Sequence, residues 1–183
     1  MSAPRAPGQR ELMTAVKSLA LRQIAQDDMR RLAAAVGRCL RGGDVVSLEG
    51  ELGSGKTFFV RQLAATFGYA HPVTSPTFVL QKLYDLPQNS LGIEQFVHYD
   101  VYRLDTYAEL LDLGFDDLAP TAVAFVEWGD RFAESLPSEC WRMHFSTVDD
   151  THRDVRILAP SEKIAALAAE LLRENLDVAI LDE

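Results

Sequence analysis

The chain has 183 residues, 48% hydrophobic and 25% charged, an ordinary globular composition with a length that suits one domain with its own core. Asp and Glu number 27 against 18 Lys and Arg, so the net charge is −9, which argues against stable nucleic-acid binding by the chain alone because such binding depends mainly on cations. No apolar run approaches the roughly 18 residues of a membrane span, and the first ten residues lack the apolar segment of a secretory signal, so we expect a cytoplasmic protein.

Apolar residues in the first half of the chain predict strands and helices on either side of a glycine-rich loop. We expect residues 1–17 to be a flexible tail and residues 18–183 to form one domain. In chain order, the expected elements are a strand over 18–24, a helix capped by Asp27 or Asp28 and ended by Gly42-Gly43, a strand over 44–49, and a helix from the loop to Gly68.

The second half predicts further strands alternating with two helices. In chain order, we expect an antiparallel hairpin with strands over 77–84 and 95–102, a short helix over 106–114 opened by a Thr106-x-x-Glu109 capping box, strands over 122–127, 141–148 and 154–159, and a helix over 161–172. This order predicts an α/β protein, and the hairpin makes the sheet mixed rather than purely parallel.

One segment matches in full the Gly-x-x-x-x-Gly-Lys-Thr spacing of a phosphate-binding loop, with an apolar strand before it and a helix after it. Its residues are Gly50-Glu51-Leu52-Gly53-Ser54-Gly55-Lys56-Thr57. Glycines let successive backbone N–H groups turn onto phosphate oxygens, and the helix N-terminus adds partial positive charge. Lys56 can reach the β- and γ-phosphates, and the Thr57 hydroxyl can ligate Mg²⁺. We therefore expect residues 51–57 to bind a nucleoside triphosphate with Mg²⁺ and the chain to hydrolyse it, within a three-layer P-loop NTPase fold whose mixed central sheet is mainly parallel.

Two acidic residues each end an apolar run and are candidates to complete the magnesium site. Asp100 follows residues 96–99, and Glu127 follows residues 123–126. An acid in this position is often only a solvated loop residue, but a P-loop needs a carboxylate partner, and Glu127 has the cleaner buried strand before it. The chain has no Asn-Lys-x-Asp guanine-reading element, which favours ATP over GTP.

Four short blocks in one order resemble the TsaE (YjeE) family of small bacterial ATPases. They are the P-loop, Ser75-Pro76-Thr77-Phe78, His98-Tyr99-Asp100-Val101-Tyr102-Arg103 and Val126-Glu127-Trp128, and the resemblance covers roughly residues 18–172. The family is needed to make threonylcarbamoyladenosine next to the tRNA anticodon. The resemblance implies that a TsaB–TsaD complex is the partner, that TsaC supplies the activated group, and that hydrolysis resets the partner complex.

The resemblance also implies roles for individual residues. Ser75, Pro76 and Thr77 form a switch loop, Glu127 is placed on the metal with Thr57, and Trp128 lies beside the nucleotide. We also expect Phe58, which follows the P-loop, to bind the nucleotide. Lys56, Asp100 and Glu127 are the expected catalytic residues. His98 is read as structural, and alternation places it on one strand face with Asp100 and Tyr102. Arg103 is left open between pairing with Asp100, facing a partner, and acting as an arginine finger.

Two other functions remain possible for a P-loop chain of this size. A small-molecule kinase would carry an arginine-rich lid, which this sequence lacks after its expected third helix, and it would transfer phosphate to a metabolite. A nucleotide-gated scaffold would bind ATP without hydrolysing it, against which the acids Asp100 and Glu127 argue.

Overall fold

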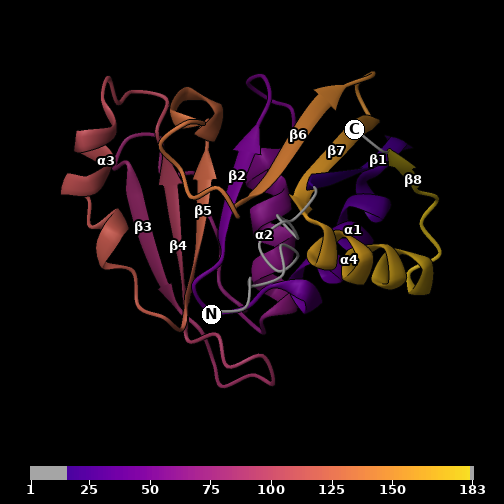
Figure 1. The fold of residues 1–183 in the computed structure, drawn as a ribbon, viewed down its shortest axis with the longest axis horizontal. Helices are drawn as coiled ribbons and strands as arrows, with labels where there is room; N and C mark the ends of the chain where they lie inside the picture. The colour runs from indigo at the N-terminus through magenta and orange to yellow at the C-terminus, as the bar shows by residue number, and fades with distance from the viewer. Residues whose placement is uncertain (1–15, 182–183) are drawn as a thin grey trace, which may run out of the picture.

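The computed structural model describes residues 16–181, which form one eight-stranded sheet with helices on both of its faces (Figure 1). The expected tail lies outside the described residues as far as residue 15, and Val16 and Lys17 belong to the first strand. The strands are β1 (Val16–Ile24), β2 (Val45–Glu49), β3 (Gln81–Asp85), β4 (Gln95–Asp100), β5 (Ala122–Glu127), β6 (Trp141–Thr147), β7 (Arg153–Pro160) and β8 (Ala179–Leu181). The helices are α1 (Gln26–Cys39), α2 (Lys56–Thr66), α3 (Tyr107–Asp112) and α4 (Ser161–Arg173), with 3-10 turns η1 (Phe115–Asp117) and η2 (Gly129–Phe132).

The sheet is mixed, and its strand order is β3-β4-β5-β2-β6-β7-β1-β8. The four central strands β4, β5, β2 and β6 run parallel, whereas β3, β7, β1 and β8 join antiparallel. This arrangement confirms the expected fold class. In the parallel register Asp100 lies opposite Glu127, and Leu48 of β2 lies opposite Glu127 on the other side. The carboxyl ends of three adjacent strands therefore meet at one edge, where ligands of open α/β sheets bind.

Side-chain alternation along the central strands divides the core into two layers. Val123 and Phe125 of β5 pack in the cluster that contains the buried faces of α1, α2 and α4. Ala124 and Val126, which point the other way, pack in the cluster formed with α3 and η1. Because both faces of β5 are covered, all six of its residues are buried, and Glu127 is carried to the site on a rigid strand.

The segment before β3 differs from the strand expected over 77–84. The N–H groups of Val79 and Leu80 both donate to the carbonyl of Pro76, at 2.8 and 2.6 Å, which closes a turn. Leu80 has a φ of 65°, so β3 begins only at Gln81. The hairpin itself is confirmed, because β3 and β4 pair antiparallel from Gln81 opposite Tyr99. β4 ends at Asp100, so Tyr102 does not continue the strand as expected.

Helix ends account for most of the other differences. The N-cap of α1 is Ala25, not Asp27 or Asp28; Asp28 lies in the first turn and accepts the N–H of Ala25 at 3.1 Å. The capping-box glutamate was expected correctly, because Glu109 accepts the N–H of Thr106 at 3.2 Å. β8 and the two 3-10 turns were not expected, since each has four residues or fewer.

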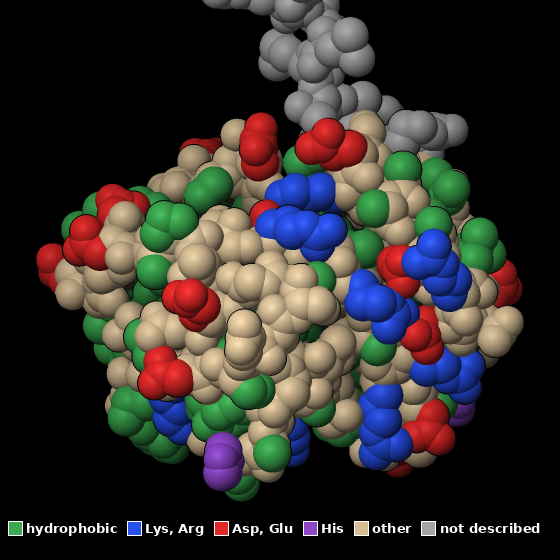
Figure 2. Space-filling view, turned by 90° about the horizontal axis from the view of Figure 1, so that it is seen from below, with side chains coloured by type: hydrophobic (Ala, Val, Ile, Leu, Met, Phe, Trp, Pro, Cys, Tyr) green, Lys and Arg blue, Asp and Glu red, His purple; other side chains and the backbone are tan. Residues whose placement is uncertain are grey.

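Lys and Arg side chains gather over the half of the molecule that carries α1 and α4, interleaved with acidic side chains (Figure 2). Arg38 of α1 donates to Glu170 of α4 at 2.6 Å and to Glu174 just beyond it at 2.5 Å. These pairs join the two helices. None of the helices between residues 16 and 181 has the length and apolar character needed to cross a bilayer.

Candidate nucleotide and magnesium site

The loop between β2 and α2 has the backbone of a phosphate cradle. Gly50, Gly53 and Gly55 have φ values of 123°, 79° and 107°, a region that other residues rarely adopt. At Gly50 space forbids a side chain as well, because a Cβ there would lie 2.2 Å from the carbonyl oxygen of Phe145. The first turn of α2, which begins at Lys56, leaves N–H groups without intrahelical acceptors, and these favour an anion.

Lys56 is a buried cation, only 4% exposed, held by the loop itself. Its Nζ donates to the carbonyls of Gly50 at 2.5 Å and Glu51 at 2.8 Å, and it lies 3.9 Å from the ring centroid of Trp128. Burial lowers the pKa of Lys56, while the charges of Glu127 and Asp100 oppose that shift. Within residues 16–181 no carboxylate lies at ion-pair distance from Nζ, so the ammonium is available to a phosphate.

Glu127 connects α2 to β4 through one oxygen. Its Oε1 accepts the Thr57 hydroxyl at 2.6 Å and lies 2.8 Å from Nε2 of His98, and the residue is 4% exposed. Burial alone raises the pKa of Glu127, but the hydrogen bonds with His98 and Thr57 and the charge of Lys56 outweigh it, so the pKa is lowered. The carboxylate is therefore ionised at neutral pH beside the Thr57 hydroxyl.

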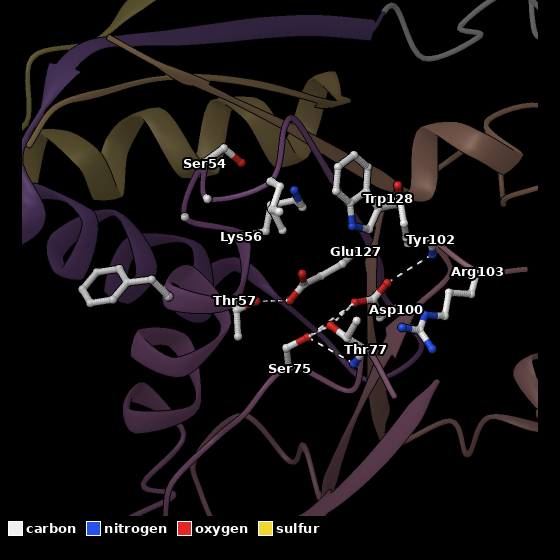
Figure 3. Close-up of a pocket in the computed structure, with 14 residues that line it drawn as sticks. Ser54, Lys56, Thr57, Ser75, Thr77, Asp100, Tyr102, Arg103, Glu127 and Trp128 are labelled. Carbon is white, nitrogen blue, oxygen red and sulfur yellow. Dashed lines mark hydrogen bonds between the residues drawn. The ribbon is translucent and has the colours of Figure 1, made fainter. Parts of the chain in front are cut away.

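Asp100 joins the end of β4 to the loop before β3. Its Oδ2 accepts the hydroxyls of Thr77 at 2.7 Å and Ser75 at 3.4 Å, and its Oδ1 accepts the N–H of Tyr102 at 3.1 Å (Figure 3). Ser75 and Thr77 also hydrogen-bond to each other at 2.5 Å. Because Asp100 is 3% exposed and both its oxygens are engaged, it fixes the position of the two hydroxyls.

These groups line one cavity of about 460 Å³ (Figure 3). Of the residues expected at the site, the structure brings the following to the cavity wall: Leu52, Gly53, Ser54, Gly55, Lys56, Thr57, Phe58, Thr77, Asp100, Glu127 and Trp128. Glu51 does not line it and contributes only its carbonyl to Lys56. Ser75 of the expected switch loop and Arg103, one of whose expected roles was an arginine finger, also line the cavity, and so does Tyr102, for which no role at the site was expected.

Tyr102 and Arg103 form the outer wall with Trp128. The rings of Tyr102 and Trp128 lie 5.0 Å apart, and Trp128 follows β5 with a φ of 65°. The Arg103 guanidinium lies 4.9 Å from the ring centroid of Phe78 and makes no ion pair with Asp100 within the described part of the chain. Pairing of Arg103 with Asp100, one of the three expectations, is therefore wrong.

A second cavity of about 510 Å³ lies on the other side of the P-loop. Gly53, Gly55 and Phe58 contribute to both cavities, and residues 24–27 and 150–151 complete the second. Arg153 also lines it and donates to the carbonyls of Ser54 at 3.1 Å and Gly53 at 3.3 Å. The P-loop is thus flanked by one cavity that contains the two acids and by a second cavity whose wall includes Arg153.

The side chains at the cavity wall suit Mg²⁺, which takes few protein ligands, better than a metal ion whose ligands all come from protein side chains. The Thr57 hydroxyl and the Glu127 carboxylate are in contact at the cavity wall. Between residues 16 and 181, no group of three or more His, Cys, Asp or Glu side chains is arranged to hold an ion. Mg²⁺ typically takes only one or two protein ligands and completes its shell with water and phosphate oxygens.

A family model described as "Threonylcarbamoyl adenosine biosynthesis protein TsaE" matches residues 24–155. Several proteins named "tRNA threonylcarbamoyladenosine biosynthesis protein TsaE" are similar over most of the chain. That of Treponema pallidum is 36% identical over 131 residues, covering 71% of this chain and 93% of that protein. That of Bacillus subtilis is 32% identical over 161 residues, covering 87% of this chain and 98% of that protein.

The fold has a solved counterpart as well. The crystal structure of YdiB from Bacillus subtilis superposes with a TM-score of 0.65 at 29% identity and covers 87% of this chain and 97% of that one. The matched range of the family model contains the P-loop, Thr77, Asp100 and Glu127.

Proposed function

This chain belongs to the TsaE family of threonylcarbamoyladenosine biosynthesis proteins, and we propose that within that pathway it binds ATP with Mg²⁺ and hydrolyses it. One observation carries the proposal: Lys56 and Thr57 of the P-loop line the same cavity as Asp100 and Glu127. A cation, a hydroxyl and two carboxylates at the carboxyl ends of adjacent parallel strands match the needs of phosphoryl chemistry.

Each group has a role in hydrolysis that follows from its position. Lys56 exchanges its two backbone carbonyls for phosphate oxygens, and the N–H groups of the loop hold the rest of the phosphate chain. Thr57 and Glu127 hold Mg²⁺, which when bound neutralises charge on the β- and γ-phosphates. Asp100, with the Ser75 and Thr77 hydroxyls that it fixes, orients the attacking water. Water attacks the γ-phosphorus, and the bond from that phosphorus to the bridging oxygen breaks with its electron pair staying on ADP; one water proton remains on the phosphate product and the other is released to solvent.

We infer that the base and ribose lie in the second cavity. The phosphates run along the P-loop, and this cavity shares Gly53, Gly55 and Phe58 with the phosphate side. Ile24 and Met29 supply apolar surface for a purine, and Arg153 supplies a cation near its phosphate end. Arg153 also donates hydrogen bonds to two P-loop carbonyls. A base or ribose that contacts Arg153 would therefore also affect the conformation of the P-loop.

We propose a TsaB–TsaD complex as the partner. Three large apolar side chains stand exposed at or near the cavity mouth, with Leu52 91%, Phe78 84% and Tyr102 54% exposed. Exposed apolar groups around a site favour docking of another protein over it. A partner in this position would exclude bulk water around the phosphates while the attacking water stays bound, and it would complete the site.

The test is Mg²⁺-dependent ATP hydrolysis by the full chain, alone and with the TsaB–TsaD complex of its own organism. The proposal predicts a rate that rises with the partners and disappears in Lys56→Met. ATP binding without hydrolysis under either condition would replace it with a nucleotide-gated scaffold. Transfer of the γ-phosphate to a small molecule would replace it with a kinase.

A further inference from the structure

Among residues 16–181, His98 is the one buried titratable side chain in contact with the site residues that the proposed mechanism does not use. It is 0% exposed and lies on β4 two residues before Asp100, on the same face of the sheet. Its ring contacts Glu127 on the neighbouring strand, with Nε2 2.8 Å from Oε1. A buried imidazole N–H needs a hydrogen-bond acceptor, and here the acceptor is the carboxylate proposed to hold Mg²⁺.

The hydrogen bonds of the ring indicate which nitrogen carries the proton. Nδ1 is buried and has no partner within residues 16–181, whereas Nε2 faces a carboxylate oxygen. A carboxylate only accepts hydrogen bonds, so Nε2 must donate. The ring therefore directs its Nε2–H donor at Glu127.

This donor determines which oxygen of Glu127 remains free. Oε1 accepts both His98 and Thr57, while Oε2 accepts no hydrogen bond from any residue between 16 and 181. The terminal torsion of a glutamate is broad, so a carboxylate without fixed donors rotates among several orientations. The Thr57 hydroxyl is itself a rotor and a metal ligand, and it cannot fix the carboxylate alone.

We propose that His98 is a positioning residue for the magnesium site: its Nε2–H holds Oε1 of Glu127 and keeps Oε2 facing the cavity for the metal or its water. The inference rests on the proposed nucleotide and magnesium binding. It predicts that His98 affects how much Mg²⁺ increases the nucleotide affinity. It also predicts that His98 does not affect the nucleotide affinity in the absence of Mg²⁺.

Two amide substitutions form a matched pair. His98→Gln places an N–H near the position of Nε2, whereas His98→Asn places its amide near Nδ1, too short to reach Oε1. The affinity for ADP is measured by calorimetry on the full chain, in EDTA and in excess Mg²⁺, and the ratio gives the gain due to the metal. We expect Gln to keep that gain within about threefold and Asn to reduce it about tenfold, the effect of one hydrogen bond to a charged group. Both variants should keep the wild-type affinity in EDTA.

Equal gains in the Gln and Asn variants would overturn the inference, as would an equal loss of affinity with and without Mg²⁺. Should Asn unfold the protein, His98→Met, which also lacks an N–H donor for Oε1, takes its place beside His98→Gln, and the same tenfold difference in the gain is expected. Failure of the proposed function is visible separately, because the wild-type chain would then not bind ADP or would bind it equally well without Mg²⁺.

Discussion

Replacing Lys56 with Met should lower the nucleotide affinity strongly while changing the free energy of unfolding little. The substitution keeps an unbranched side chain of similar length but removes the ammonium that donates to Gly50 and Glu51. Burial lowers the pKa of Lys56 below its ordinary 10.5, so the folded protein binds this proton less tightly than the unfolded chain does. The protonated lysine therefore opposes folding at neutral pH, and this effect disappears above pH 10.5, where the side chain is neutral in both states.

The two consequences differ in size. Loss of the cation removes hydrogen bonds to phosphate, each worth about 1.5–3 kcal/mol when a charged group is involved. We therefore expect ADP affinity to fall about 100-fold, equivalent to about 2.7 kcal/mol. Gly50 is partly exposed and Glu51 is exposed, so we expect water to reach the released carbonyls and the free energy of unfolding to fall by no more than about 1 kcal/mol at pH 7.

Calorimetric titration with ADP and Mg²⁺, together with urea unfolding at pH 7, measures both quantities. Lys163→Met is the matched control, because Lys163 lies on α4 away from the cavity and pairs with Asp44 at 2.7 Å. It should leave ADP affinity unchanged. An ADP affinity of Lys56→Met within threefold of wild type would refute the proposal that Lys56 binds the nucleotide phosphates in this cavity. A fall of more than about 2 kcal/mol in the free energy of unfolding would refute the inference that the buried Lys56 cation does not stabilise the fold.

Glu127→Gln and Asp100→Asn should each reduce ATP turnover more than ADP affinity, because both acids act on the metal or the attacking water. Phosphate-release assays measure the turnover and calorimetric titrations measure the affinity. Equal losses in the two measurements would contradict this prediction. Arg153→Ala should weaken ADP binding about tenfold by removing the brace on the P-loop carbonyls, and an unchanged calorimetric affinity would exclude that role. The N–H of Gln23 and the side chain of Arg22 lower the pKa of Asp154, so its carboxylate stabilises the fold above pH 3.8. The urea midpoint of Asp154→Asn should therefore lie below that of wild type at neutral pH, and the two midpoints should converge as the pH falls below 3.8.

The core strands were predictable because their burial is expressed directly in sequence. β5 was expected over 122–127 and is found at those residues, since both of its faces are covered and it reads as one apolar run. The segment over 77–80 was mistaken for a strand because its residues are β-branched and aromatic. Its turn depends on the Pro76 carbonyl and on the left-handed Leu80, which composition does not express.

The left-handed glycines of the P-loop and the helix that follows it were predictable from one local motif, but the contacts between strands were not. The pairing of His98 with Glu127 depends on the register of β4 against β5, and the sequence alone does not specify that register. His98 was therefore read as structural, although its spacing of two from Asp100 was a usable signal. The contact of Arg103 with Phe78 depends on the turn before β3.

The place of β1 in the sheet has a consequence for synthesis on the ribosome. β1 pairs with β7 and β8, and its Arg22 contacts Asp154, 132 residues later in the chain. At about 5–20 residues per second, β1 emerges on the order of ten seconds before its partners. During that interval Leu19 and Leu21, fully buried in the finished protein, have no strand beside them. The nascent chain therefore exposes the apolar side chains of its first strand to aggregation or chaperone capture until β7 and β8 emerge.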